Sequence, residues 1–419
     1  MTPQPSRKPW YLRIGPGLIT ACVVIGPGSL VTSSKVGADE KYSMLWVIVV
    51  SVAFMMLYMT LGAKLGAVGK EAPCDLIRRK AGQWLAILVG FGVFFIATAF
   101  QSGNNIGVAA TFEAFIESKT ISVVLIVLFN LAAISFLFVF KDMYRMLERV
   151  MMVFVGLMLL SFVINLIALR PDVAEMARGL VTPTLGQKKE LLPVLGLIGT
   201  TFISAAAFYQ AYLVRQKGWG IDDVKDGLID ARIGSAIMFL ITVMLMSTAA
   251  AGLSQRENLS LNSPVDIATA LETTFGASAK VIFCFGLFSA AYSSFLVNSI
   301  IGGFMAADGL GLGSKPTDLV PRVLTTVALL LGMLVAIAVI VFNFDRTPTI
   351  IAAQAVTVVV APLIAGVLLW LTSSRDVMGD HVNKPWTIAF GLLGLALLLV
   401  LAGKTAFSDL PAKLEAYLG

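Results

Sequence analysis

The amino-acid sequence predicts an all-α protein that crosses a membrane about eleven times. Of its 419 residues, 58% are hydrophobic and only 13% are charged, whereas an average soluble protein has roughly 25% charged residues. So few charges cannot cover a water-soluble surface. Because a span needs about 20 apolar residues, we expect the spans at 14–38, 43–66, 83–110, 121–140, 150–169, 190–216, 230–253, 278–306, 321–343, 347–371 and 386–403.

Tryptophans and basic residues support these spans and orient them. The tryptophans fall at or just outside the predicted span ends, where the indole ring favours the headgroup region. Most Lys and Arg residues lie in the segments that share a side with the N-terminus. Because cytoplasmic loops are rich in these residues, we expect a cytoplasmic N-terminus. An odd number of spans then places the C-terminus outside a bacterial-type inner (plasma) membrane.

The composition also excludes several classes of function. Cys22, Cys74 and Cys284 have neither the spacing of a disulfide framework nor that of a zinc site. The single histidine, His381, excludes any mechanism that needs two. With no Walker motif and no Ser–His–Asp arrangement, we expect no enzyme activity and no cofactor. The net charge of +6 suits basic cytoplasmic loops, so the expected partners are lipid and a substrate, not nucleic acid.

The first span carries Gly26, Pro27, Gly28 and Ser29 at its middle. Proline removes a backbone donor and clashes with the preceding turn, and glycine adds backbone freedom. At the depth of a membrane, freed backbone groups are tolerated only inside protein or beside a cavity. We therefore predict a broken helix here, next to a binding site.

The sixth span carries a matching feature. Gly196–Ile198 repeats the sequence of Gly17–Ile19, which places the small residues Ser204–Ala207 opposite the break in the first span. Paired interruptions in two halves mark the binding site of transporters built from inverted repeats. We therefore expect a single transmembrane domain, 1–419, with repeats at 14–169 and 190–371 and an extra eleventh span at 386–403.

These segments resemble the Nramp family of divalent metal transporters, over nearly the whole chain. The similarity runs without gaps from 26 to 46, the family's first span and following loop. It recurs at 141–151, 171–172, 196–199, 286–303 and 354–362. The resemblance implies the LeuT-type fold, a 5+5 inverted repeat with spans 1 and 6 broken.

The family's metal ligands are missing from the corresponding positions. The family has Asp-Pro-Gly-Asn in span 1, where Gly26 stands at the Asp position and Ser29 at the Asn position. It has Met-Pro-His in span 6, where Ile203, Ser204 and Ala205 stand instead. A carboxylate and a polarizable sulfur discriminate such metals, so the sequence predicts no metal site of the family's usual kind.

The family's proton route also lacks its titratable groups. The acid pair of span 3 is replaced by Gln101 and Asn104, and the acid on the outer half of span 1 is replaced by Ser33. An amide does not change its charge near neutral pH. Of the family's polar site residues, Gln354 in span 10 is retained.

Three interpretations of this pattern are open, and the first takes a small neutral or anionic organic solute, such as a carboxylate, as the substrate. The N–H groups that follow Gly28 would form the positive end of a helix dipole, which binds carboxylates. Thr32 and Ser33 would add hydroxyl donors, and Lys35 would attract anions. Besides the span-1 residues, the expected substrate-binding residues are Ser204, Ala205, Tyr209 and Gln354.

In the second interpretation, a hydrated Mg- or Mn-type divalent cation binds through its waters to Ser29, Gln101, Asn104, Asn105 and Gln354. In the third, the protein is a homologue that does not transport and acts as a receptor. For either transport interpretation, the mechanism is alternating access, with spans 1, 2, 6 and 7 rocking against the rest.

The coupling ion, sodium or proton, is left open by the sequence, as are the substrate's identity, the direction of transport and the oligomeric state. Ser293 and Ser294 in span 8 form a candidate sodium site, because in LeuT-type symporters such a hydroxyl pair helps to hold sodium together with carbonyls of span 1. Helix packing is the alternative role for these small hydroxyls.

Overall fold

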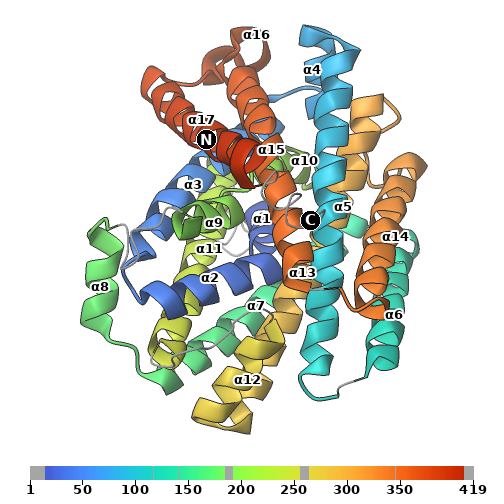
Figure 1. Cartoon of the computed structure of the whole chain (residues 1–419). Helices are drawn as coiled ribbons and strands as arrows, with labels where there is room; N and C mark the ends of the chain where they lie inside the picture. Colours follow the sequence, from blue (N-terminus) through green and yellow to red (C-terminus); the bar gives the residue numbers. More distant parts are fainter. Residues whose placement is uncertain are drawn as a thin grey trace, which may run out of the picture.

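Every regular element in the described part of the chain is a helix (Figure 1). The structure is a computed structural model that describes residues 15–116, 118–140, 142–184, 192–254, 264–344 and 346–409. Nine of its helical stretches are long and apolar enough to cross a membrane, and two bent helix pairs raise the total to as many as eleven. The predicted all-α membrane fold is confirmed.

The observed helices match the predicted spans, most of them to within a few residues. The largest differences are earlier starts for the fifth and seventh spans, at Met143 and Val224. The spanning helices are α1 (Pro16–Val24) with α2 (Pro27–Glu40), α3 (Leu45–Val68), α5 (Gln83–Glu113), α6 (Lys119–Val139), α7 (Met143–Leu169), α9 (Leu192–Thr201) with α10 (Ser204–Gln216), α11 (Val224–Leu253), α13 (Ala277–Leu310), α14 (Leu319–Val341), α15 (Arg346–Ser373) and α17 (Pro385–Lys404).

Four short helices lie in the links between spans and were not predicted. They are α4 (Pro73–Ala81), α8 (Val173–Val181), α12 (Pro264–Phe275) and α16 (Arg375–Met378). Helices α4 and α16 lie at one end of the molecule and α12 lies at the other, whereas α8 lies at the side (Figure 1). None is long enough to span a membrane, and a prediction based on long apolar runs does not include helices this short.

Both predicted helix breaks are present, but the second lies elsewhere than expected. Helices α1 and α2 are bent by 59° at Ile25–Gly26. Helices α9 and α10 are interrupted at Phe202–Ile203, and the predicted break, Ser204–Ala207, forms the first turn of α10. The correction has a plain cause, since alanine has the highest helix propensity of all residues.

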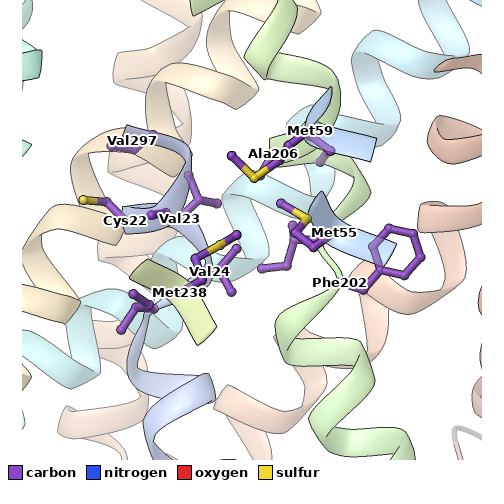
Figure 2. Packing of buried hydrophobic residues seen from close by; sticks show 14 of the residues in the cluster. Cys22, Val23, Val24, Met55, Met59, Phe202, Ala206, Met238 and Val297 are labelled. Carbon is purple, nitrogen blue, oxygen red and sulfur yellow. The ribbon is translucent and has the colours of Figure 1, made fainter. Parts of the chain in front are cut away.

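Two groups of helices surround these breaks. Helices α1, α2, α3, α10 and α11 pack on one another, and α5, α13 and α14 form a second group against which α1 also packs. Figure 2 shows Met55, Met59 and Met238 gathered near Val24, at the end of α1. Apolar side chains exposed on α6, α7, α14 and α17 suit contact with lipid.

Candidate functional site

The first-span break leaves Gly26 in extended conformation between two helices. Its φ and ψ are −120° and −179°. Its N–H donates to Val24 O at 3.1 Å, and its carbonyl accepts from Leu30 N at 3.0 Å, which starts α2. The helical hydrogen-bond ladder is therefore interrupted inside the protein, at the junction of α1 and α2.

Two side-chain oxygens face Gly26 from the second helix group. A Cβ atom added to Gly26 would lie 2.9 Å from Ser294 Oγ of α13 and 3.5 Å from Asn104 Oδ1 of α5. Ser294 Oγ donates to Val23 O at 3.3 Å and accepts from Asn298 Nδ2 at 2.8 Å. A hydroxyl and an amide oxygen, both neutral, thus lie close against Gly26.

Hydrogen bonds between amides hold Asn104 in this position. Gln101 Nε2 donates to Phe295 O at 2.9 Å, and Gln101 Oε1 accepts from Asn104 Nδ2 at 2.9 Å. Because the Asn104 nitrogen is occupied by Gln101, its oxygen is the atom presented to the break. Asn105 takes another direction and accepts from Asn130 Nδ2 of α6 at 2.7 Å. The predicted amide cluster therefore divides, with only Asn104 facing Gly26.

Pro27 is held by a close approach between two helices. A Cβ atom at Gly107 of α5 would overlap the Pro27 ring and would lie 3.3 Å from Ala291 Cβ. Only glycine at 107 lets α5 come this near to the break. The kink is therefore fixed by tertiary packing as well as by the proline itself.

Three buried hydroxyls beside the two breaks have no hydrogen-bond partner among the described residues. They are Ser29 Oγ and Ser33 Oγ on successive turns of α2 and Thr201 Oγ1 at the end of α9. All three residues are at most 2% exposed. Leaving a buried polar group without a hydrogen bond costs about 1–3 kcal/mol of stability. These hydroxyls are therefore suited to form hydrogen bonds with a bound ligand or with its water.

Among the other predicted site residues, the Tyr209 hydroxyl is also buried without a hydrogen-bond partner in the described part of the chain. Ser204 Oγ donates to Ala361 O of α15 at 3.0 Å, and the Tyr209 ring stacks on Tyr212 with centroids 5.4 Å apart. Ala205 is buried, Thr32 is half-buried and Lys35 is exposed. Gln354 belongs to α15, but its side chain lies outside the described residues.

The candidate sodium site is only partly assembled. Ser294 reaches the Val23 carbonyl of the first span, as such a site requires, but Ser293 Oγ donates to Ala290 O within its own helix at 3.2 Å. In the described part of the chain, no three His, Cys, Asp or Glu side chains are grouped to hold a metal ion.

Comparison with known proteins places the chain in a family. Residues 17–408 match the family described as "Natural resistance-associated macrophage protein-like", or Nramp. The chain belongs to the Nramp family. It is thus an integral membrane protein of a family of secondary transporters, as the sequence resemblance predicted.

Two Nramp relatives are similar over most of the chain. The "Divalent metal cation transporter MntH" of Chromohalobacter salexigens is 26% identical over 417 residues, with 97% of this chain and 93% of the relative covered. The "Metal transporter Nramp5" of Oryza sativa subsp. japonica is 24% identical, with 94% of this chain and 75% of the relative covered.

Solved structures confirm the LeuT-type fold. The Eremococcus coleocola manganese transporter matches with a TM-score of 0.82 at 19% identity, covering 96% of this chain and 87% of its own. MhsT, solved in complex with L-phenylalanine, matches with a TM-score of 0.58 at 14% identity, covering 93% of this chain and 98% of its own.

The sequence analysis did not single out Asp230 and Asp308, two of the buried carboxylates of this Nramp chain. Asp230 of α11 accepts from Gly15 N at 2.7 Å, from Gly17 N at 2.6 Å and from Gln210 Nε2 at 3.1 Å. It therefore joins the start of α1 to both α10 and α11. An acid inside an apolar span is a functional candidate by default, and that rule would have selected it.

Asp308, at the end of α13, is the second buried carboxylate that joins separate helices. Its Oδ2 accepts from Tyr212 OH of α10 at 2.5 Å and from Cys74 N of α4 at 3.0 Å. Tyr212 belongs to the first helix group and Asp308 to the second. This contact therefore holds the two groups together at the end of the molecule that carries α4.

Proposed function

We propose that the protein transports a divalent metal cation that keeps part of its hydration shell, by alternating access between the two helix groups. The proposal rests above all on the oxygens around Gly26, namely Asn104 Oδ1 and Ser294 Oγ. We further propose the two repeats at 14–169 and 190–371, a cytoplasmic N-terminus and an external C-terminus.

The donor chemistry favours a hard cation. Magnesium, calcium and manganese prefer carboxylate, carbonyl and water oxygens, whereas soft thiolate and thioether ligands select other metals. Neutral oxygens offset little of the ion's charge, so stripping its water would be very costly here. Magnesium in particular gives up its water reluctantly, and we expect it to be bound through water to Asn104, Ser29 and Ser294.

The names of the relatives support the same substrate class. The bacterial and rice relatives are named as metal transporters, and the similar solved structure is titled a manganese transporter. This evidence favours the cation interpretation over the organic solute that the sequence alone put first. The family's Asp and Met ligands are replaced here by Gly26 and Ile203. We take this replacement to weaken the discrimination among divalent ions, rather than to change the class of substrate.

The Asn104→Asp substitution tests the cation proposal at the site. It places a carboxylate of nearly the same shape opposite Gly26, so the affinity for manganous ion should rise by about tenfold, equal to roughly 1.4 kcal/mol. Calorimetry on the purified protein measures this change. Asn130→Asp is the control, since it buries the same charge on α6, next to Asn105, the amide that faces away from Gly26. Unchanged or weaker manganese binding in Asn104→Asp would contradict the proposal.

A small organic carboxylate is the second candidate, and one observation favours it. Pro27 opens α2, so the N–H groups of Gly28 and Ser29 lie in its first turn, where helix geometry supplies no acceptor. The unpartnered Ser29 and Ser33 hydroxyls lie on the same helix. Together with the positive helix end, these donors suit an anion.

Lys35→Gln separates the two candidates by the sign of its effect. Lys35 is exposed on α2, so its charge acts on an approaching solute through a screened field. Removing the charge should raise cation uptake by about twofold to threefold at low salt, and the gain should disappear at high salt. For a carboxylate substrate, uptake should fall instead. Radiolabelled uptake of both solutes distinguishes these outcomes.

A further inference from the structure

A cavity of about 270 Å³ lies at the end of the molecule that carries α4, away from the helix breaks. It lies between the end of α10, the link from α3 to α4 and the link from α13 to α14. Its polar lining consists of Tyr212, Arg215, Gln216, Ser314 and Lys315, and no carboxylate belongs to the lining. A single buried water needs only about 10–15 Å³, so the cavity has room for a larger solute.

The donors on α10 are held in place. Arg215 Nη1 donates to Gly69 O at the end of α3 at 2.6 Å. A guanidinium has five N–H donors, so this contact fixes the group and uses one of them. Gln216 Nε2 is buried and makes no hydrogen bond with the described residues. The α10 side of the cavity therefore offers a cation and an amide donor.

The opposite side is formed by an ordered turn. The backbone N–H groups of Ser314 and Lys315 donate to Asp318 Oδ2 at 3.0 and 2.9 Å. The Asp318 carboxylate thereby fixes the turn that carries the Lys315 side chain. The nearest buried acid, Asp308, already accepts from Tyr212 and Cys74. Both neighbouring carboxylates therefore have donors of their own.

We propose that this cavity binds a phosphate group. Its donors come from two separate elements and include a guanidinium, an ammonium, an amide and a hydroxyl. A phosphate presents several oxygens in different directions, and Arg and Lys are its usual partners. Two sources share this chemistry, a free phosphate in solution and the phosphate of a lipid headgroup.

The bound group would act as a clamp. Arg215 lies on α10, which packs with the first helix group, whereas Lys315 follows α13 of the second. A phosphate that contacts both side chains favours the arrangement in which α10 lies against α13. It would thereby stabilise the closed state of this end, since a ligand shifts an equilibrium toward the state that it binds better.

Thermal unfolding of the purified protein in phosphate, against chloride of equal ionic strength, tests binding. Wild type should be stabilised by phosphate in a saturable way. Lys315→Gln should weaken the apparent phosphate affinity by about tenfold. Lys384→Gln is the matched control, because this exposed lysine at the start of α17 carries the same charge away from the cavity. Equal responses of the two variants would overturn the site.

Cys74 reports the proposed clamp directly. Its thiol is fully buried on α4 and lies 3.3 Å from the Tyr212 hydroxyl of α10, so we expect it to react faster when α10 moves away from α4 and α13. Maleimide labelling, read by mass spectrometry, should be slowed by phosphate in wild type and not in Lys315→Gln. Maltoside micelles contain no phosphate, so adding inorganic phosphate to one sample and phosphatidylglycerol to another separates the two sources. Protection in neither arm contradicts the proposal.

Discussion

Replacing Gly107 with valine is expected to abolish transport. The added Cβ would overlap the Pro27 ring and crowd Ala291, so α5 could no longer approach the break. Overpacking of this kind typically costs about 1–3 kcal/mol, and here it displaces the residues that border the site. Uptake should fall by more than about tenfold, the factor that 1.4 kcal/mol gives.

The control for this substitution is Gly156→Val. Gly156 is also a glycine within a spanning helix, but a Cβ atom added there would meet nothing within 4 Å. Its uptake and its unfolding temperature should match those of the wild type. If Gly107→Val transported at the wild-type rate, the close packing of Pro27 against α5 would have no functional role.

The Asp230→Ala substitution should release the start of α1. Loss of the carboxylate leaves Gly15 N, Gly17 N and the Gln210 amide without their acceptor. Each buried donor left unpaired costs about 1–3 kcal/mol, so the unfolding temperature should fall by several degrees or more. Because α1 then detaches more readily, the buried thiol of Cys22 on α1 should react faster with maleimide.

Asp222→Ala provides the comparison for Asp230→Ala. Asp222 is an exposed acid just before α11, so its loss removes the same charge without leaving a buried donor unpaired. A faster Cys22 reaction in Asp230→Ala alone would support the role of Asp230 at the start of α1. Similar labelling in both variants would show that the contact does not restrain α1.

The sequence predicted those features that depend on local chemistry. Span positions follow from apolar length, and the break at Gly26–Pro27 follows from the backbone properties of glycine and proline. The second break was misplaced by two residues because the Phe202–Ile203 interruption carries no such local marker. An alanine run at the same depth was mistaken for it, although alanine favours helix.

Contacts between distant helices could not be predicted in this way. The split of Asn104 and Asn105 toward different helices depends on where α6 and α13 lie. The packing of Pro27 against Gly107 likewise depends on where α5 lies relative to the break. Asp230 is different, because an acid within an apolar span could have been noticed from composition alone.

Uptake by the purified protein in liposomes tests the central claim most directly. Radiolabelled manganese and magnesium should both enter, each should compete with the other, and a panel of small carboxylates should compete with neither. Empty liposomes give the background rate, and Gly107→Val should not exceed it. Saturable carboxylate uptake without cation uptake would contradict the claim and favour the second candidate. Uptake of no solute at all would contradict both transport proposals and favour a receptor.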